Sequence, residues 1–280
     1  MGPYPMKQFA PAKINLYLHI LGKRPDGFHE LETLMAPISF GDDLDIERAP
    51  SGIHLSCTNQ NLPLNEDNLA YRAAAIFLKE FKIDSGVIIS LEKRIPIGAG
   101  LGGGSSNAAA VLLALRKLFA VEATDEHLAR LAAQLGSDIP FFIYEGKAAV
   151  CKGRGEIIEP LALHGKYQGL LVHPGFGVST PWAYKTYAAN PLRGVSGKQT
   201  VDSFILRNDL ETAAFSKYLW LPTAKAWFQQ QPEVYDSLMS GSGSSVFALT
   251  HDEAGIEPLR QRFLAEHGAE LFATGFKVAV

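Results

Sequence analysis

The stretch IPIGAGLGGGSSNAAAVLLALRKLF, residues 95–119, contains the densest glycine cluster of the chain and leads directly into an alanine- and leucine-rich segment. Five glycines fall within seven positions, at 98, 100, 102, 103 and 104. Glycine allows positive φ angles and lets main-chain N–H groups approach a ligand that a Cβ would push away. A loop of this kind at a helix N-terminus binds anions. The stretch therefore predicts a site for the phosphates of a nucleotide.

The residues that follow the glycines predict the start of a helix. Ser105, Ser106 and Asn107 are types that favour an N-cap and a first turn. Residues 108–119 have the composition of a helix that is buried along one side. The two hydroxyls also suit a magnesium ion that accompanies the phosphates, and Ser106 is the candidate ligand. No other metal ligand can be named from the sequence.

Other interpretations of the glycine loop carry less weight. A flexible surface turn seldom leads directly into a strongly apolar helix. Gly98, Gly100 and Gly103 match the dinucleotide pattern G-x-G-x-x-G, with Glu122 where a ribose-binding acid would fall. In a dinucleotide site the glycines follow a strand at once, whereas charged residues and a proline separate them here from the apolar residues 87–91. The absence of G-K-[ST], H-R-D and D-F-G excludes a Walker A loop and a protein-kinase motif set.

Composition predicts a globular protein with one large or two ordinary domains. The 280 residues are 47% hydrophobic and 20% charged, and the net charge of -3 gives no reason to expect a nucleic-acid partner. We see no secretory signal and no membrane span, and we expect residues 1–5 to be a dispensable extension because Met6 offers a second start. Cys57 and Cys151 are too few for a disulfide scaffold or a zinc cluster, which favours the reducing cytoplasm. The sequence leaves monomer and homodimer open.

Strict alternation over residues 12–21 predicts a half-buried strand. Its polar face carries Lys13 and Asn15, which suit a charged ligand as well as solvent. A Pro-Asp-Gly turn then leads into Phe28 and His29. Taken alone, a histidine such as His29 is more often structural than a ligand contact.

The remainder predicts alternating strands and helices, which indicates an α+β protein. Extended segments are expected at 28–38, 43–48, 53–58, 87–91, 141–159, 168–173, 246–250 and 276–280. Helices are expected at 65–81, 108–119, 124–135, from about 181, and at 209–215, 223–229, 233–239 and 252–267. Residues 190–199 are the best candidate for a mobile segment. Asp138 follows the end of a helix, where the macrodipole disfavours an acid, so we expect a reason for it other than helix stability.

Four segments together resemble the GHMP kinases, the superfamily of galactokinase, homoserine kinase, mevalonate kinase and phosphomevalonate kinase. They are PAKINLYL at 11–18, IPIGAGLGGGSSNAA at 95–109, LGSDIPFF at 135–142 and SGSGSSVFA at 240–248. The resemblance implies a ribosomal-protein-S5-like N-terminal domain, residues 1–160, and a ferredoxin-like C-terminal domain, residues 161–280. It also implies that ATP and substrate bind in the cleft between the two domains.

Five shorter motifs narrow the resemblance to the family of 4-diphosphocytidyl-2-C-methyl-D-erythritol kinases of the non-mevalonate isoprenoid route. They are KINL at 13–16, PDGFH at 25–29, GSDIP at 136–140, HPG at 173–175 and NDLE at 208–211. This resemblance covers nearly the whole chain. It implies an ATP- and Mg²⁺-dependent kinase that phosphorylates the 2-hydroxyl of a small cytidine-diphosphate-linked alcohol.

The same resemblance assigns residues to roles. Lys13 and Asp138 serve the transferred phosphoryl group, and Asp138 is either a true base or an orienting group. The triphosphate is held by the glycine loop, namely Pro96, Ile97, Gly98, Ala99, Gly100, Leu101, Gly102, Gly103, Gly104, Ser105 and Ser106, and adenosine-side contacts fall on Asn68 and Lys93. The residues that bind the substrate are Asn15, Phe28, His29, Thr180 and Tyr184, with the cytosine between the aromatic rings. The family usually has tyrosine where this chain has Phe28, a change that keeps stacking and removes a phenolic hydrogen bond.

Two alternative functions remain open. One is another small-molecule GHMP kinase such as homoserine or mevalonate kinase, against which the aromatic pair Phe28 and Tyr184 argues. The other is a catalytically silent nucleotide-binding relative, against which the retention of Lys13, Asp138 and the full loop argues. Phosphoryl transfer needs mainly positioning and charge neutralisation, and the residues present supply both.

Overall fold

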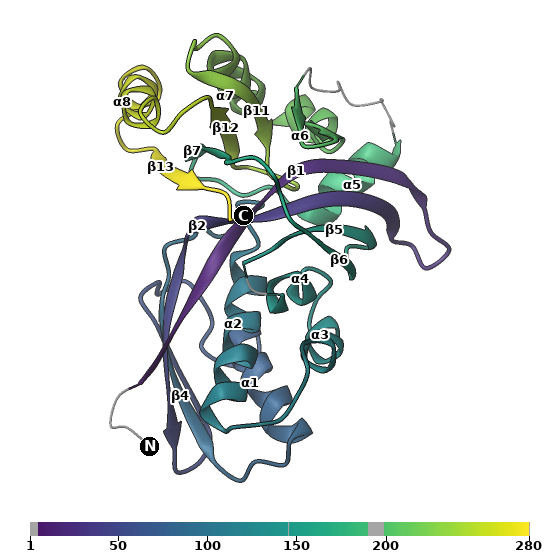
Figure 1. Cartoon of the computed structure of the whole chain (residues 1–280), viewed down its shortest axis with the longest axis vertical. Helices are drawn as coiled ribbons and strands as arrows, with labels where there is room; N and C mark the ends of the chain where they lie inside the picture. The colour runs from purple at the N-terminus through teal and green to yellow at the C-terminus, as the bar shows by residue number, and fades with distance from the viewer. Residues whose placement is uncertain (1–4, 145, 190–198, 280) are drawn as a thin grey trace. The chain divides into compact units, whose positions relative to one another are not determined.

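A computed structural model describes residues 5–144, 146–189 and 199–279 of the chain (Figure 1). The chain forms two compact units, each built from separate stretches. The first unit takes its described residues from Met1–Ala12, Gly41–Ile95 and Gly102–Glu145, and the second from Lys13–Phe40, Pro96–Leu101 and Gly146–Val280. Strands β1 (Met6–Lys23) and β2 (His29–Ala49) contribute to both units. The domain boundary at 160/161 therefore stays a prediction, because compactness divides the chain at other points.

The first unit combines strands β3 (Ile53–Cys57) and β4 (Gly86–Glu92) and parts of β1 and β2 with a group of helices. Strand β4 pairs parallel with β3 and antiparallel with residues 43–49 of β2. The helices are α1 (Leu69–Glu80), α2 (Gly103–Leu118), α3 (Asp125–Ala133) and α4 (Ile139–Ile143). Helix α2 packs against α1, α3 and α4, and α3 and α4 also pack against each other.

Helix α2 is longer at its N-terminus than the sequence predicts. It begins at Gly103 and not after the serines, because Gly102 adopts a left-handed conformation that caps the helix. Residues 106–115 are all buried, which fixes this helix in the core of the first unit. The last glycines of the loop thus belong to a rigid element.

The second unit contains a four-stranded antiparallel sheet with the order β11-β12-β7-β13. Its strands are β7 (Gln168–His173), β11 (Val234–Met239), β12 (Val246–Thr250) and β13 (Phe272–Lys277). Helix α7 packs on β11 and β12, and α8 packs on β7 and β13 (Figure 1). The unit's helices are α5 (Thr180–Ala189), α6 (Glu211–Lys217), α7 (Trp220–Gln229) and α8 (Ile256–His267).

The second unit also holds the parts of β1 and β2 that carry predicted site residues. Strand β1 lies between β10 (Arg207–Asn208) and β2, with Tyr17 opposite Arg207 in a parallel pairing. Strand β2 pairs with β5 (Ala148–Gly153), and β5 pairs with β6 (Ile157–Leu161). A short hairpin joins β8 (Thr200–Val201) to β9 (Phe204–Ile205).

The predicted helix over residues 233–239 is wrong. These residues form strand β11, in which Ser237 lies opposite Ala248 and Leu238 opposite Phe247 of β12. Pairing with residues of β12 that lie 7 to 16 positions away decides this segment, since its mixture of apolar and polar residues fits either type of structure.

Smaller corrections concern two other segments. Residues 141–143 belong to helix α4 and are not extended. The last strand is β13, which spans residues 272–277 and not 276–280. The expected mobile segment at 190–199 lies almost wholly outside the described residues. No described helix has the length and apolar character needed to cross a bilayer.

Candidate active site

The first turn of helix α2 has backbone N–H groups for which the described residues provide no side-chain cap. Gly102 has a φ of 69°, in the left-handed region that favours glycine, and among the described residues no side chain caps this end. The N–H of Ser106 donates to Gly102 O at 2.8 Å. The N–H groups that precede it in the first turn have no acceptor within the helix. This arrangement is suited to an anion such as a phosphate.

Ser106 adds a buried hydroxyl to the same turn. The residue is 1% exposed, and its Oγ has no hydrogen-bond partner in the described part of the chain. Buried hydroxyls normally have a partner, so an oxygen left alone suits a ligand. Mg²⁺ is usually held by one or two protein oxygens together with substrate phosphates. Ser106 fits such an ion, whereas the described residues contain no cluster of three or more His, Cys, Asp or Glu that would hold a metal alone.

Asp42 holds the segment that leads into the glycine loop. The residue is fully buried, and its Oδ1 accepts the backbone N–H groups of Arg94 at 2.7 Å and Ile95 at 2.8 Å. Its Oδ2 accepts Nζ of Lys93 at 2.5 Å and Nδ2 of Asn107 at 2.8 Å. One carboxylate therefore connects the segment after β4 to the first turn of α2. No local sequence pattern identifies Asp42, because its partners are more than fifty positions away.

The two residues expected on the adenosine side both make structural bonds. Lys93 carries the ion pair described above, and a Cβ on Gly103 would come within 2.8 Å of its Nζ. Asn68 is the N-cap of α1, where its Oδ1 accepts the N–H of Ala70 at 2.9 Å. Contact of either residue with a nucleotide stays a prediction.

Asp138 precedes helix α4 directly and is its N-cap residue, with Pro140 in the first turn. The residue is partly buried. Its side chain makes no capping bond, and no described residue pairs with its carboxylate. We expected this acid to lie unfavourably at the C-terminal end of a helix dipole. That expectation is corrected, because Asp138 also lies at the N-terminal end of α4, where a negative charge is favourable. Its carboxylate is available to a ligand.

Lys13 brings predicted catalytic, substrate and loop residues together in the second unit. The residue is 4% exposed, and its Nζ donates to Oδ1 of Asn15 at 2.6 Å and to Gly100 O at 2.9 Å. Its backbone N–H donates to Leu101 O at 3.0 Å. Asn15 in turn donates to Oγ1 of Thr33 at 2.8 Å. The polar face of β1 is therefore buried here and not simply exposed to solvent.

A second glycine-serine loop, residues 240–245, contacts the first. Oγ of Ser240 donates to Gly100 O at 2.9 Å, and the N–H of Ser245 donates to Ala99 O at 3.1 Å. A Cβ on Gly100 would come within 2.1 Å of Ser240 O, so only glycine fits at that position. The sequence identifies residues 240–245 as a loop but gives no sign of this contact.

The predicted aromatic residues pair in an unexpected way. The ring of Tyr184 stacks on His29, with centroids 5.3 Å apart and planes inclined by 25°. Phe28 is 52% exposed, and the guanidinium of Arg154 lies 4.7 Å from its ring centroid. Nε2 of His29 is buried without a partner among the described residues, and burial, aided by the charge of Lys23, lowers the pKa of this histidine.

Thr180, the remaining predicted substrate residue, begins helix α5. Its Oγ1 lies 2.8 Å from Oγ of Ser242 in the 240–245 loop. The predicted residues thus divide between the two units. Lys13, Asn15, Phe28, His29, residues 96–101, Thr180 and Tyr184 lie in the second, and Asn68, Lys93, residues 102–106 and Asp138 in the first.

Comparison with known proteins defines the class. The family model described as "GHMP kinases N terminal domain" matches residues 68–146, and "GHMP kinases C terminal" matches residues 201–270. A crystal structure of 4-(cytidine 5'-diphospho)-2C-methyl-D-erythritol kinase superposes with a TM-score of 0.84 at 36% identity, covering 98% of this chain and 100% of that one. The fold, with its N- and C-terminal parts of mixed α and β structure, is that of a GHMP kinase, a small-molecule kinase for which ATP is the phosphoryl donor.

Two curated relatives narrow the assignment. The 4-diphosphocytidyl-2-C-methyl-D-erythritol kinase of Methylacidiphilum infernorum is 54% identical over 255 residues, which cover 89% of this chain and 87% of the relative. The enzyme of the same name from Prosthecochloris aestuarii is 40% identical over 282 residues, which cover 96% and 98%. The chain belongs to the family of 4-diphosphocytidyl-2-C-methyl-D-erythritol kinases.

Proposed function

We propose that this chain transfers the γ-phosphoryl group of ATP to the 2-hydroxyl of 4-diphosphocytidyl-2-C-methyl-D-erythritol. The observation that carries the proposal is the buried ammonium of Lys13, which is bonded at once to Asn15 and to Gly100 of the glycine loop. A cation in that position can interact both with a substrate and with a phosphate group of the nucleotide. The names of the similar enzymes supply the identity of the substrate.

The proposed reaction assigns a separate role to each group. The amides at the N-terminus of α2 bind phosphate oxygens. The oxygen of the substrate hydroxyl bonds to the γ-phosphorus while the bond between the γ-phosphorus and the leaving ADP breaks. Asp138 accepts the proton that the hydroxyl loses. Lys13 stabilises the negative charge on the transferred group, which is where such enzymes gain most of their rate.

Mg²⁺ would be held by the phosphates of the nucleotide and by Ser106. When bound, it neutralises phosphate charge and so supports transfer of the phosphoryl group. The buried, unpartnered Oγ of Ser106 supports this assignment. A change of Ser106 to Ala should raise the Mg²⁺ concentration needed for half-maximal rate.

The proposed substrate subsite consists of Asn15, Phe28, His29, Thr180 and Tyr184. The stacked His29 and Tyr184 rings offer a flat surface for the cytosine, and the exposed Phe28 ring can supply a second one. Base-on-aromatic stacking contributes about 1 to 3 kcal/mol per base. Stacking tolerates any base, so preference for cytosine has to come from hydrogen bonds, for which the unpartnered Nε2 of His29 is the candidate.

The experiment that tests the proposed function measures ADP release across a substrate panel. We expect turnover with the cytidine-diphosphate-linked methylerythritol and little with methylerythritol itself, homoserine or mevalonate. Asp138→Asn and Lys13→Ala should each lower kcat by about 10² to 10⁴. Preference for homoserine or mevalonate, or ATP binding without any turnover, would disprove the assignment.

The setting of the enzyme is part of the same proposal. We propose the cytoplasm as its compartment, supported by two cysteines that form no disulfide. We propose that it acts as a monomer or homodimer on a small molecule and without nucleic acid. Size-exclusion chromatography with light scattering distinguishes the two oligomeric states.

A further inference from the structure

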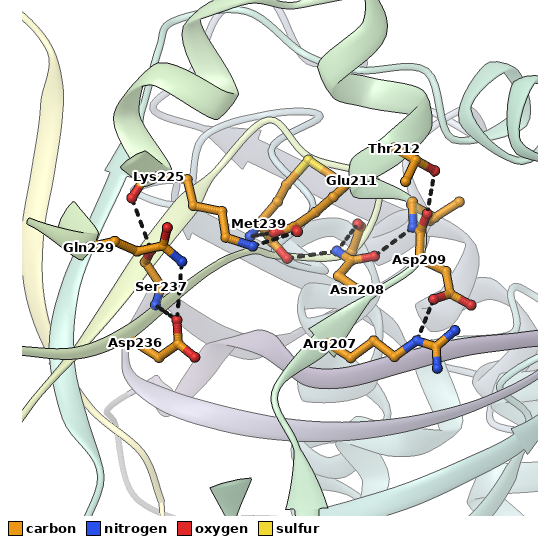
Figure 2. A network of polar contacts seen from close by, with 12 residues as sticks. Arg207, Asn208, Asp209, Glu211, Thr212, Lys225, Gln229, Asp236, Ser237 and Met239 are labelled. Atoms are coloured by element: carbon orange, nitrogen blue, oxygen red, sulfur yellow. Dashed lines mark hydrogen bonds and ion pairs between the residues drawn. The ribbon is translucent and has the colours of Figure 1, made fainter. Parts of the chain in front are cut away.

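A buried polar network surrounds the segment Asn208–Glu211, which the proposed reaction leaves without a role (Figure 2). Asn208 is 1% exposed, Asp209 is fully buried and Glu211 is 5% exposed. Buried polar groups are costly unless each finds a partner, so their bonds indicate what this segment holds in place. Asn208 and Glu211 both bond to the backbone of Met239, and Asp209 bonds to β1.

Asn208 holds the start of the 240–245 loop. Its Nδ2 donates to Met239 O at 2.7 Å and to Gly241 O at 2.8 Å, on either side of Ser240. Its Oδ1 accepts the N–H of Leu210 at 3.0 Å. The Asn208 side chain thus donates both of its amide hydrogens to backbone carbonyls at the start of this loop. Its amide oxygen accepts a hydrogen bond from within its own segment. Figure 2 shows the bond to Met239 at the centre of the network.

Gly241, which Asn208 fixes, packs against the proposed catalytic lysine. A Cβ at Gly241 would lie 3.1 Å from Gly100 O, 3.2 Å from Nζ of Lys13 and 3.3 Å from Oδ1 of Asn15. The backbone of Gly241 therefore forms one side of the space that Lys13 and Asn15 occupy. A shift of this residue by a fraction of an ångström would move the ammonium or open a gap beside it.

The other two side chains of the segment bond to groups other than Gly241. Asp209 accepts the N–H of Ile20 at 2.9 Å and Nε of Arg207 at 2.5 Å, so it connects to β1 well away from Lys13. Glu211 accepts the N–H of Met239 at 2.9 Å. In the described structure, Asn208 alone of these three side chains bonds to Gly241.

We propose that Asn208 is a positioning residue for phosphoryl transfer, which holds Gly241 so that Gly241 confines the ammonium of Lys13. The inference rests on the proposed function, and in particular on the role of Lys13 in the transition state. A small misplacement of a catalytic group can lower the rate about 10²-fold without removing any group that touches the substrate. The proposal therefore predicts an effect on kcat that exceeds the effect on KM.

Two isosteric variants of adjacent residues separate positioning from structural support. Asn208→Asp keeps the acceptor for Leu210 and removes both bonds to the loop, whereas Asp209→Asn leaves the loop bonds intact and weakens the link to β1. Both changes alter a buried polar group and should lower the melting temperature. At a temperature where both variants are folded, we expect kcat to fall about 10- to 100-fold in Asn208→Asp and less than about threefold in Asp209→Asn. Equal losses in the two variants would overturn the proposal.

A double-mutant cycle tests whether Asn208 acts through Lys13. If it does, Asn208→Asp should lower kcat far less in a Lys13→Ala background than in the wild type, because the group that it positions is already gone. The same fold-loss in both backgrounds would show that Asn208 acts independently of the lysine, and the proposal would be wrong.

A further variant keeps the test decisive if Asn208→Asp fails to fold. Gly241→Ala leaves Asn208 intact and introduces a methyl group into the space beside Lys13, and it should lower kcat at least about 10-fold. Gly146→Ala is its control, since Gly146 has a similar positive φ of 72° and nothing within 4 Å of the added methyl. Equal turnover of the two variants would contradict the proposal. A failure of the proposed function would instead appear in the wild-type enzyme, as absence of turnover with the cytidine-diphosphate-linked substrate.

Discussion

Asp42 in the first unit and Asn208 in the second are both buried side chains that fix a glycine-containing segment, yet they do so with opposite chemistry. Asp42 is an anion that accepts four hydrogen bonds, one of them from the ammonium of Lys93. Asn208 is neutral and donates to two backbone carbonyls, of Met239 and Gly241. The first arrangement contains two buried charges, and the second contains none.

The difference has consequences for how each arrangement fails. Removing one partner of a buried ion pair leaves an uncompensated charge, which costs far more than the pair contributes. Removing a neutral donor leaves two carbonyls unsatisfied, a smaller and more local penalty. We therefore expect damage at Asp42 to unfold the first unit, and damage at Asn208 to loosen a loop.

The largest effect is expected from Asp42→Ala. The change leaves Lys93 buried without its counterion, and it should lower the free energy of unfolding by about 3 to 5 kcal/mol. Urea denaturation followed by circular dichroism measures this. Adding Lys93→Met should recover part of the loss, because the unpaired charge is then gone as well. If the double variant is no more stable than Asp42→Ala, the buried charge is not the cause.

Acid should weaken the second unit through His173, which lies under the loop that Asn208 holds, with Nδ1 3.3 Å from Oγ of Ser244. Burial lowers the pKa of His173 from 6.5 to about 4. Between these two values the unfolded chain binds a proton that the folded chain does not. Stability should therefore be full above pH 6.5 and fall as the pH falls toward 4, by at most about 3 kcal/mol.

The measurement compares the wild type with His173→Asn. The free energy of unfolding is determined for both proteins from pH 7.5 to pH 4. The difference between them should shrink or change sign as the pH falls. Parallel curves would show that protonation of His173 does not contribute.

A smaller loss is expected from Asn208→Ala. Two buried carbonyls lose their donor, which should cost about 1 to 3 kcal/mol. Amide hydrogen exchange should rise around residues 239–245, and helix α2 should keep its protection. Faster exchange in both units would indicate that Asn208 supports more than its loop.

The smallest effect concerns Asn68, which caps helix α1. Asn68→Ala should lower stability by about 1 kcal/mol, the usual cost of losing an N-cap side chain. Asn68→Asp keeps the capping oxygen and should lose less. The KM for ATP in Asn68→Asp then reports on the predicted nucleotide contact separately from the cap. An unchanged KM would leave Asn68 with a structural role only.

The sequence predicts local features of this protein well. Alternation over residues 12–21 identifies strand β1, and the run of glycines before an apolar segment identifies the start of α2. The types of Asn65 to Asn68 mark the start of α1. Each of these signals arises within about ten residues, so the residues alone carry it.

Features that depend on contacts between residues distant in the chain could not be predicted from the sequence. Asp42 bonds to Asn107, 65 positions away, and Asn208 bonds to Gly241, 33 positions away. Strand β11 was predicted to be a helix because its pairing with β12 is not a local property. The stacking of His29 on Tyr184 is likewise a product of the fold, and composition gives no sign of it.

The second unit contains contacts between residues near the start of the chain and residues near its end, which the ribosome adds long after the first. Ile38 bridges to Val278, the N–H of Ala279 donates to Pro37 O, and the N–H of Lys277 donates to Oγ of Ser39. A ribosome that adds about 5 to 20 residues per second needs about 12 to 48 seconds to pass from the first of these partners to the last. During that interval residues 37–39 lack these partners, so their backbone groups can pair with other chains until the last of these residues has been translated.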